Sequence, residues 1–297
     1  MNALLILWRF SRPHTIIGSA LSVTALYAMV CARPGAVPDH WGVWLPSLLS
    51  ALACNVFITG LNQWSDVEVD RINKPWLPIA AGSLSKAGAL RIVLISLGIA
   101  LATAAMLSWA FFGLIALIAL LGWAYSMPPI HLKQHHFGAA LVITVVRGLL
   151  VNLGFYAHYR ALLTDVSGWD PVIVPLTAFV ALFSIGIAWF KDIPDTKGDL
   201  EYRFGTLAVQ MGRGAALWLG TVVVVMGYLA VIIPALFGLL PNGLFFVTAF
   251  ALPLFLFLLM AAKVNVKDDR DVKRFYYFFW GLFFLAYVLY PMGLILA

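Results

Sequence analysis

Nine long apolar runs, separated by short polar segments, dominate this chain of 297 residues. Only 11% of its residues are charged and 63% are hydrophobic, whereas soluble domains carry roughly 25% charged residues. Each run is long enough to cross a bilayer as a helix, and in lipid only helices or closed barrels satisfy every backbone polar group. The runs exceed the roughly ten-residue alternating strands of a membrane barrel. The sequence therefore predicts an all-α, polytopic membrane protein.

We expect nine transmembrane helices that form a single domain over residues 1–297. The third and fourth spans are separated only by Ser108 to Ala110, and this break decides which side of the membrane every later loop faces. The apolar pattern predicts spans at 14–30, 43–61, 89–107, 111–127, 137–157, 172–190, 216–237, 243–262 and 276–297.

Charge supports this topology independently. With nine spans, sixteen lysines and arginines fall on the side that holds the N-terminus, against Arg33 and Arg160 on the other side. The positive-inside rule places the sixteen at the cytoplasmic face or its equivalent. The net charge of +6 therefore reflects orientation in a lipid bilayer. Basic and aromatic residues are not interleaved, so we expect no nucleic-acid partner, and residues 1–13 suit an interfacial helix better than a signal peptide.

An acidic cluster follows the second predicted span. On a helix, Asn62, Asp66 and Asp70 share one face, with Lys74 one turn further on. Carboxylate and amide oxygens are ligands that Mg²⁺ accepts, and protein-bound Mg²⁺ usually completes its shell with water and substrate phosphate. A single cluster of this kind is more often a solvated loop between membrane helices.

A second acidic cluster follows the sixth predicted span and favours a metal site over a solvated loop. Asp192, Asp195 and Asp199 also share a face if they are helical, and Lys191 and Lys197 lie beside them. The predicted topology puts both clusters on the same side of the membrane. Together they predict a site that holds Mg²⁺ around a diphosphate, with lysines neutralising the remaining phosphate charge.

Three prolines bear on the local structure of these clusters. Pro75 and Pro78 are expected to end the first acidic helix and to hold the segment after it extended. Pro194 is compatible with the first turn of a helix or with a break that leaves a turn.

Several other polar residues are candidates for substrate contacts. Arg147 lies near the middle of the fifth span, where an arginine costs about 2.5–3.5 kcal/mol, so it faces either a substrate cavity or an internal ion pair. Tyr125 and Lys133 flank the loop after the fourth span and are placed either to reach phosphate or to act as an aromatic anchor and a topology signal. Arg12 and His14 offer cations at the mouth of the first span, with a snorkelling arginine as the alternative.

The two acidic motifs resemble those of the UbiA-type intramembrane prenyltransferases, and within that superfamily the homogentisate prenyltransferases of tocopherol and plastoquinone synthesis. Chlorophyll synthases and 4-hydroxybenzoate prenyltransferases are similar but typically carry Asn-Asp where this chain has Asn62-Gln63, so Gln63 favours homogentisate. The second family pattern is matched at Lys191, Asp192, Asp195, Gly198 and Asp199, and the first at Asn62, Gln63, Asp66, Asp70, Asn73, Lys74, Pro75, Leu77, Pro78, Ala80 and Gly82.

The resemblance implies a fold with nine helices around a central cavity. It also implies Mg²⁺-dependent transfer of a phytyl or similar prenyl group from an allylic diphosphate to the ring of homogentisate, with loss of CO2. The site would face the cytoplasm or stroma, in a plasma or thylakoid membrane.

The resemblance further assigns roles to the candidate residues. The metal ligands implied are Asn62, Asp66, Asp70, Asp192, Asp195 and Asp199. The catalytic residues implied are Asp66, Asp70, Asp192, Asp195 and Lys191, and the substrate-binding residues are Asn62, Arg71, Lys74, Tyr125, Lys133, Arg147, Arg12 and His14. Which of Arg12, His14 and Arg147 holds the carboxylate of the acceptor stays open.

Two alternatives stay in view. Another aromatic or tetrapyrrole prenyltransferase, such as 4-hydroxybenzoate prenyltransferase or chlorophyll synthase, would use the same metal site. A secondary transporter belongs to a different class, but its site would lie near the membrane midplane at broken helices, whereas these carboxylates cluster at the ends of spans.

Overall fold

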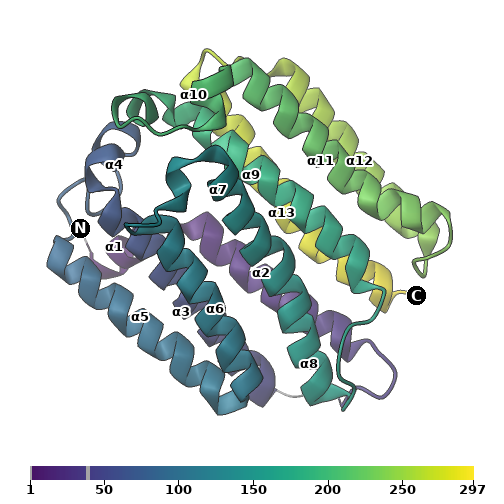
Figure 1. The fold of residues 1–297 in the computed structure, drawn as a ribbon. Helices are drawn as coiled ribbons and strands as arrows, with labels where there is room; N and C mark the ends of the chain where they lie inside the picture. The colour runs from purple at the N-terminus through teal and green to yellow at the C-terminus, as the bar shows by residue number, and fades with distance from the viewer. Residues whose placement is uncertain (1, 38–40) are drawn as a thin grey trace.

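The computed structural model describes residues 2–37 and 41–297, and over these residues its regular structure is helical apart from one isolated bridge between His135 and Gly205. Within the described residues, nine helices are long and apolar enough to cross a membrane. The predicted all-α class and the nine spans are confirmed. Figure 1 shows the long helices packed side by side.

The first four spans are α2 (Pro13–Cys31), α3 (Trp41–Ser65), α5 (Lys86–Leu107) and α6 (Trp109–Ser126). The fifth combines α7 (His136–Ile143), the π-helical segment η2 (Thr144–Phe155) and α8 (Tyr156–Leu163), and the last four are α9 (Ile173–Glu201), α11 (Arg213–Leu236), α12 (Gly243–Lys263) and α13 (Asp269–Ile295). The short elements are α1 (Ala3–Phe10), α4 (Val67–Asn73), η1 (Leu132–Gln134) and α10 (Leu207–Met211).

A single residue, Ser108, separates the third and fourth spans. Ser108 has an extended backbone (φ −168°, ψ 155°), and its hydroxyl accepts a hydrogen bond from the backbone N–H of Phe111 at 3.1 Å. This is a helix N-cap, which satisfies one of the unpaired donors of the new helix. The expected break at Ser108 to Ala110 is therefore present, and the order of the later loops follows from it.

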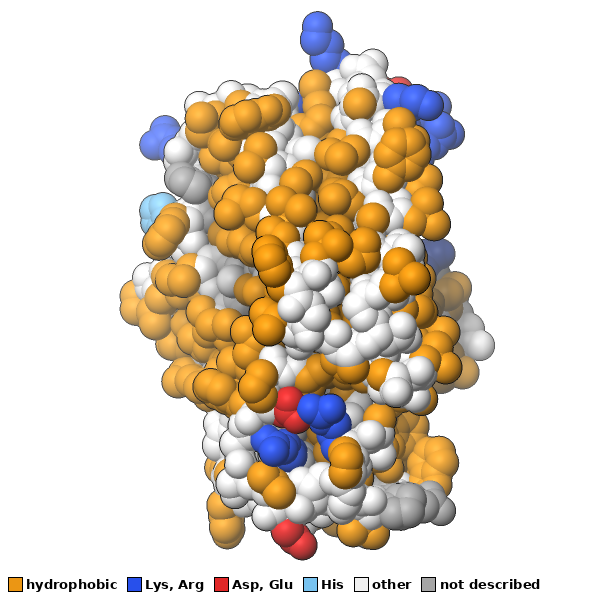
Figure 2. Space-filling view, turned by 90° about the vertical axis from the view of Figure 1, so that its right-hand side faces the viewer, with side chains coloured by type: hydrophobic (Ala, Val, Ile, Leu, Met, Phe, Trp, Pro, Cys, Tyr) orange, Lys and Arg blue, Asp and Glu red, His pale blue; other side chains and the backbone are white. Residues whose placement is uncertain are grey.

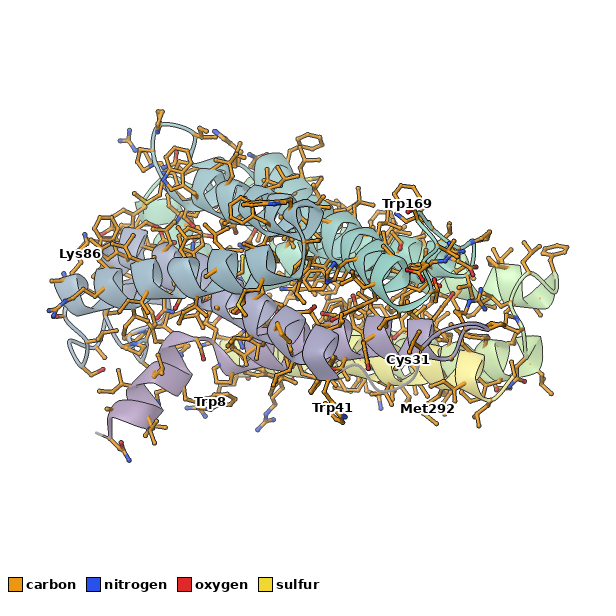
Figure 3. The ribbon with its side chains drawn as sticks, turned by 90° about the horizontal axis from the view of Figure 1, so that it is seen from below. Trp8, Cys31, Trp41, Lys86, Trp169 and Met292 are labelled. Carbon is orange, nitrogen blue, oxygen red and sulfur yellow. The ribbon has the colours of Figure 1, made fainter. Side chains whose placement is uncertain are left out.

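The ends of the helices separate as the predicted topology requires. In Figure 3, Lys86 lies at one end of the helices, whereas Cys31, Trp169 and Met292 lie toward the other end. The acidic segments after α3 and at the end of α9 belong to the Lys86 end. Apolar side chains cover much of the side shown in Figure 2, and the charged side chains seen there gather near its top and bottom.

The central helix of the bundle is α9. In the most apolar 18-residue stretch of α9, 67% is buried inside the protein, compared with 17% in the corresponding stretch of α5 at the edge of the bundle. Aromatic rings pack tightly against it, and Phe183 of α9 stacks on Phe279 of α13 with ring centroids 4.0 Å apart. The second acidic cluster is thus carried by the helix that the rest of the bundle surrounds.

The fifth span is not a regular α-helix throughout. Its middle 12 residues form the π-helical segment η2, a form that often occurs at functional sites. The side chain of Asn152 donates to the carbonyls of Arg147 and Gly148, both at 2.9 Å, and accepts from the Tyr287 hydroxyl at 2.9 Å. A Cβ at Gly148 would lie 2.6 Å from the Cα of Ala181, so glycine allows this span to approach α9 closely.

The predictions made for the prolines were correct in one respect only: α4 ends at Asn73, directly before Lys74 and Pro75. Pro194 lies inside α9, which continues to Glu201, and neither starts nor breaks it; neighbouring helices make such a proline tolerable in a membrane span. The segment after α4, which contains Pro75 and Pro78, forms turns and is not extended. The backbone N–H of Leu77 donates to the carbonyl of Lys74 (3.0 Å), and that of Ala81 donates to the carbonyl of Leu77 (2.8 Å).

Candidate active site

A cavity of about 670 Å³ opens at the end of the bundle that carries both acidic segments. Its mouth is polar, and its deeper part is apolar. All of the site residues predicted from the sequence line this cavity except Arg71. The polar residues that line it include Arg12, His14, Asn62, Asp66, Asp70, Asn73, Lys74, Tyr125, Lys133, Arg147, Lys191, Asp192, Asp195, Asp199 and Thr206.

The first acidic segment is interrupted at one residue. The helix α3 ends at Ser65 and α4 starts at Val67, with Asp66 between them at φ −102°. The backbone hydrogen bonds from Asp66 to Asn62 (3.0 Å) and from Asp70 to Asp66 (2.7 Å) continue the helical pattern across the break. A continuous helix was the wrong expectation, but the three side chains still reach the same cavity.

The second acidic segment is the last turns of α9. Asp192, Asp195 and Asp199 are buried there and line the cavity. Lys191 lines it too, whereas Lys197 is exposed and lies outside it.

Asn73 ties the two acidic segments together. Its side-chain oxygen accepts from the backbone N–H of Gly198 at 2.9 Å, and its amide nitrogen lies 3.4 Å from Asp199 Oδ1. A Cβ at position 198 would lie 2.6 Å from that oxygen, so only glycine permits the contact. The Lys74 ammonium forms an ion pair with Asp195 of the same helix. These contacts hold α4 against α9.

Basic side chains neutralise the carboxylates from the other sides of the cavity. Lys133 is buried and lies 2.5 Å from Asp66 Oδ1. Lys191 donates to the Tyr125 hydroxyl at 2.7 Å and lies 3.6 Å from Asp192 Oδ1. Anionic phosphate oxygens entering this mouth would therefore meet cations already held in place.

The amide of Asn62 is occupied by two neighbours. Its oxygen accepts from Arg12 Nη2 at 3.1 Å, and its nitrogen donates to Asp66 Oδ2 at 3.1 Å. In this arrangement Asn62 orients Asp66 and Arg12, and its role as a metal ligand stays a prediction.

Burial is the largest single influence on the pKa values of Asp70, Lys74 and Lys133 at the cavity mouth. It raises the pKa of Asp70 from 3.8 to about 6, although Lys74 and Arg12 oppose the shift. Burial also lowers the pKa of Lys133, with Asp66 opposing it. Burial alone would lower the pKa of Lys74 too, but the attraction of Asp195 and Asp70 raises it overall.

The donor set fits Mg²⁺ held together with a substrate. Asp70 lines the cavity, and its Oδ2 is buried and accepts no hydrogen bond from the described residues, so this oxygen has an unused lone pair. Within 2–37 and 41–297, no three His, Cys, Asp or Glu side chains converge closely enough to hold a metal alone. Mg²⁺ commonly binds through one or two carboxylates and takes its other ligands from water and phosphate.

Arg147 occupies a separate part of the cavity, beside aromatic rings. Its guanidinium carbon lies 4.7 Å from the ring centre of Trp280 and 5.4 Å from that of Phe283. The ring of His14 packs edge-on against Trp280 at 4.9 Å. Among the ion pairs of the described residues, Arg147 has no acidic partner. The structural ion pair considered from the sequence is thus not formed.

Two residues singled out in the sequence lie outside the cavity. Arg71 is exposed and pairs with Glu68 at 2.6 Å, three residues earlier on α4. Gln63 is buried, and its side chain donates to the backbone oxygen of Phe10 at 2.6 Å. Gln63 therefore joins α3 to the end of α1 and does not face the substrate space.

Sequence reasoning assigned no role to Asn73, Gly198 or Trp280. The first two were matched only as positions of the family motifs, and their contact joins segments 125 residues apart. For Trp280 a signal was present, because all six residues 275–280, at the start of the last span, are aromatic.

The family model described as the UbiA prenyltransferase family matches residues 21–291. The chain belongs to the UbiA prenyltransferase family. It is 39% identical to the homogentisate phytyltransferase of Synechocystis sp., over 97% of this chain and 94% of that protein. It is 36% identical to the chloroplastic homogentisate solanesyltransferase of Arabidopsis thaliana, over 96% of this chain and 75% of that protein.

Solved structures share the fold of this UbiA family member. A UbiA homologue from Archaeoglobus fulgidus, solved with GPP and Mg²⁺ bound, superposes with a TM-score of 0.68 at 17% identity, covering 98% of this chain and 100% of that one. A structure of digeranylgeranylglyceryl phosphate synthase superposes with a TM-score of 0.69 at 18% identity, covering 100% of both chains. Membership of the UbiA prenyltransferase family, together with the nine apolar helices of the described residues, identifies the protein as an integral membrane prenyltransferase, as the motifs predicted.

The raised pKa of Asp70 predicts how stability depends on pH. Between pH 3.8 and about 6 the folded protein holds a proton on Asp70 more tightly than the unfolded chain does. Its contribution to stability is therefore largest below pH 3.8 and is lost as the pH rises through 6. The pKa difference corresponds to about 3 kcal/mol at neutral pH.

We therefore expect Asp70→Asn to be more stable than the unmodified protein at pH 7 in Mg²⁺-free detergent, by up to about 3 kcal/mol. The difference should disappear toward pH 4, as measured by thermal unfolding at a series of pH values. Glu68→Gln, on the exposed side of the same helix, should show no such trend. An Asp70→Asn protein that is equally destabilised at pH 4 and pH 7 would contradict this assignment.

Proposed function

We propose that this protein transfers a phytyl or similar prenyl group from an allylic diphosphate to the aromatic ring of homogentisate, with Mg²⁺ as cofactor and with loss of CO2. One observation carries the proposal: two buried acidic segments and their lysines converge on a cavity whose deeper part is apolar. The similarity to homogentisate prenyltransferases over nearly the full chain supports the choice of acceptor.

The diphosphate would bind at the polar mouth. Lys74, Lys133 and Lys191 approach the mouth from three different elements and supply positive charge for its oxygens. The carboxylates that would hold Mg²⁺ are Asp66 and Asp70 on one side and Asp192, Asp195 and Asp199 on the other. When bound, Mg²⁺ supplies positive charge that stabilises the departing diphosphate.

The remainder of the cavity would protect the reacting carbon. Loss of diphosphate leaves an allylic cation, which water would quench. Apolar residues line the space below the mouth, including Ile58, Ile118 and Val146, so the cation forms where few water molecules compete with the acceptor. Aromatic faces such as Trp280 also attract a cation.

We assign the carboxylate of the acceptor to Arg147. Of the three candidates left open by the sequence, Arg12 is bound to Asn62, and the ring of His14 packs against Trp280. Arg147 lines the cavity without an acidic partner in the described residues. Its planar fork of donors suits a carboxylate, and the neighbouring Trp280 and Phe283 would face the aromatic ring.

The overall reaction then balances without an added acid or base. The ring carbon that gains the prenyl group loses a proton, and the side chain that loses CO2 gains a proton at its methylene carbon.

We further propose that residues 1–297 act as one catalytic domain with the cavity mouth at the cytoplasmic or stromal face of a plasma or thylakoid membrane. The bias of sixteen basic residues against two supports this orientation. The donor would reach the mouth from that compartment, with its tail in the lipid.

Purified protein in detergent, given labelled phytyl diphosphate, provides the first test. Homogentisate, 4-hydroxybenzoate and chlorophyllide are offered separately, each with Mg²⁺ and with EDTA. We expect a Mg²⁺-dependent product and CO2 from homogentisate alone. Product from another acceptor alone would overturn the assignment of homogentisate, and full activity in EDTA would overturn the assignment of Mg²⁺.

Removing one carboxylate from each segment tests the metal site. Asp66→Ala and Asp195→Ala are each expected to reduce kcat by at least about a hundredfold, because each removes charge that positions the leaving group. Glu68→Ala, on α4 but outside the cavity, should keep activity. Membrane insertion is compared for all three proteins. Substantial activity in both Asp variants would remove the support for a metal held between the segments.

Replacing Arg147 tests the acceptor site. Arg147→Leu should raise KM for homogentisate about 10- to 100-fold, as expected for the loss of a hydrogen bond to a charged group, and leave KM for the prenyl diphosphate unchanged. Arg91→Leu, at an exposed position of α5, is the control. Equal loss of affinity for both substrates would indicate that Arg147 has a structural role instead.

A further inference from the structure

A second hollow, which we call the lateral groove, lies between α3, α5 and α6, which pack side by side at one edge of the bundle (Figure 1). Its volume is about 450 Å³, and every side chain that lines it is aliphatic, aromatic or methionine. Leu94 of α5 and Leu120 of α6 line it and are more than half exposed. In a membrane the lateral groove therefore opens to lipid.

The lateral groove is separate from the cavity that holds the acidic segments. The two hollows share no lining residue, because they lie on different faces of α3 and α6. Between them the helices touch: a Cβ at Gly122 of α6 would lie 2.5 Å from the side chain of Ile58 on α3, so glycine is needed for this approach. A ligand of the lateral groove is thus distinct from the proposed prenyl donor and acceptor.

The length of the lateral groove matches one leaflet of a bilayer. At the end nearer the cavity mouth it is lined by Trp64, Leu90 and Trp123, and at the deeper end by Leu101 and Ala116. Leu90 and Leu101 are eleven positions apart on α5, which is about 16 Å at the rise of an α-helix. The hydrocarbon core is roughly 30 Å thick, so each leaflet contributes about 15 Å.

A positive charge lies at the mouth end of the lateral groove. Lys86 is one helical turn before Leu90 and therefore on the same face of α5, and its ammonium lies 4.5 Å from the ring centre of Trp64. Among the described residues Lys86 has no acidic partner. Tryptophans such as Trp64 and Trp123 are enriched at headgroup level. An unpaired cation at that level complements an anionic headgroup.

The walls of the lateral groove explain why it is unfilled and what it excludes. On α6 it is lined by Ala116 and Ala119, whose side chains end at Cβ and leave room beside the leucines of α5. Apart from the indole N–H groups of its two tryptophans, the lining offers no hydrogen-bonding side chain. A polar molecule would therefore lose hydrogen bonds on entering, whereas an acyl chain would lose none.

We propose that the lateral groove binds one acyl chain of an anionic glycerophospholipid from the leaflet at the cavity mouth, with the phosphate headgroup at Lys86. Transfer of an acyl chain from bilayer to groove gains no hydrophobic energy, since both surroundings are apolar. Packing against the three helices holds the chain, and the charge of Lys86 selects the headgroup.

Native mass spectrometry of the purified full-length protein tests the headgroup. Phosphatidylglycerol and phosphatidylcholine with identical acyl chains are added in detergent, and the Kd of the first bound lipid is measured for each. Phosphatidylglycerol should bind about fivefold more tightly, the effect of one lysine near an anionic lipid. Lys86→Gln should remove this preference. Arg91→Gln, which removes an exposed charge of α5 outside the lateral groove, should keep it. Equal affinity for both lipids in the unmodified protein, or equal loss of preference in both variants, would overturn the proposal.

Filling the lateral groove tests the acyl chain. Ala116→Phe should weaken the binding of both lipids at least about tenfold, because it overfills the deeper end. Leu117→Phe is the matched control, since Leu117 is the next residue, is exposed and does not line the groove. If thermal unfolding shows that Ala116→Phe does not fold, Leu94→Ala removes part of the wall without crowding and should weaken both lipids about threefold through lost contacts. Unchanged affinity in a folded groove variant would overturn the proposal.

Two further outcomes would assign the lateral groove to a different occupant and overturn the proposal. Displacement of phosphatidylglycerol by a non-hydrolysable prenyl thiolodiphosphate would indicate that the donor tail lies there. A dimer that Ala116→Phe dissociates would indicate a second copy of this chain. None of these measurements uses prenyl transfer, so the proposed function and this inference can fail independently.

Discussion

Charge compensation in a confined space is the constraint on which this structure depends. Five carboxylates from two distant segments face one cavity mouth, and burying a carboxylate without a partner is strongly unfavourable. The ion pairs of Lys133 with Asp66 and of Lys74 with Asp195 make the approach of the segments tolerable. The compensation is incomplete at Asp70, whose Oδ2 has no donor among the described residues. The mouth thus retains capacity for a further cation.

The overall architecture could be predicted from the sequence because lipid leaves few alternatives. Uncharged runs of sufficient length must be helical, and a single N-cap such as Ser108 is enough to separate two of them. The local features that the sequence did not predict depend on packing between helices. The π-helical segment around Arg147 depends on the approach of Gly148 to Ala181 and on the Tyr287 contact, and Pro194 is accommodated by the helices that surround α9. No local pattern encodes these contacts.

The composition of the site could also be predicted, since residues at helical spacing next to a membrane span must lie on one face. Its internal contacts could not. Arg71 belongs to the same motif as Asp70, but its position on α4 directs it to Glu68 at the surface. The bond from Gly198 to Asn73 and the position of Trp280 beside Arg147 both join residues more than a hundred positions apart. Only the packing of α4, η2 and α13 around α9 brings them together.

The buried side chains beyond the end of the cavity, among them Phe111 and His158, have a consequence for the membrane itself. Charged side chains line the cavity mouth, and an open path from this mouth through the rest of the bundle would dissipate ion gradients. Leu26 and the stacked rings of Phe111 and His158 are buried and do not line the cavity, and closely packed apolar and aromatic side chains hinder the passage of water and of the ions that travel with it. Toward the opposite face, Arg33 and Asp170 form an ion pair between the α2 and α9 ends. The bilayer around this protein can therefore remain electrically insulating while charged reactants enter and leave from one side.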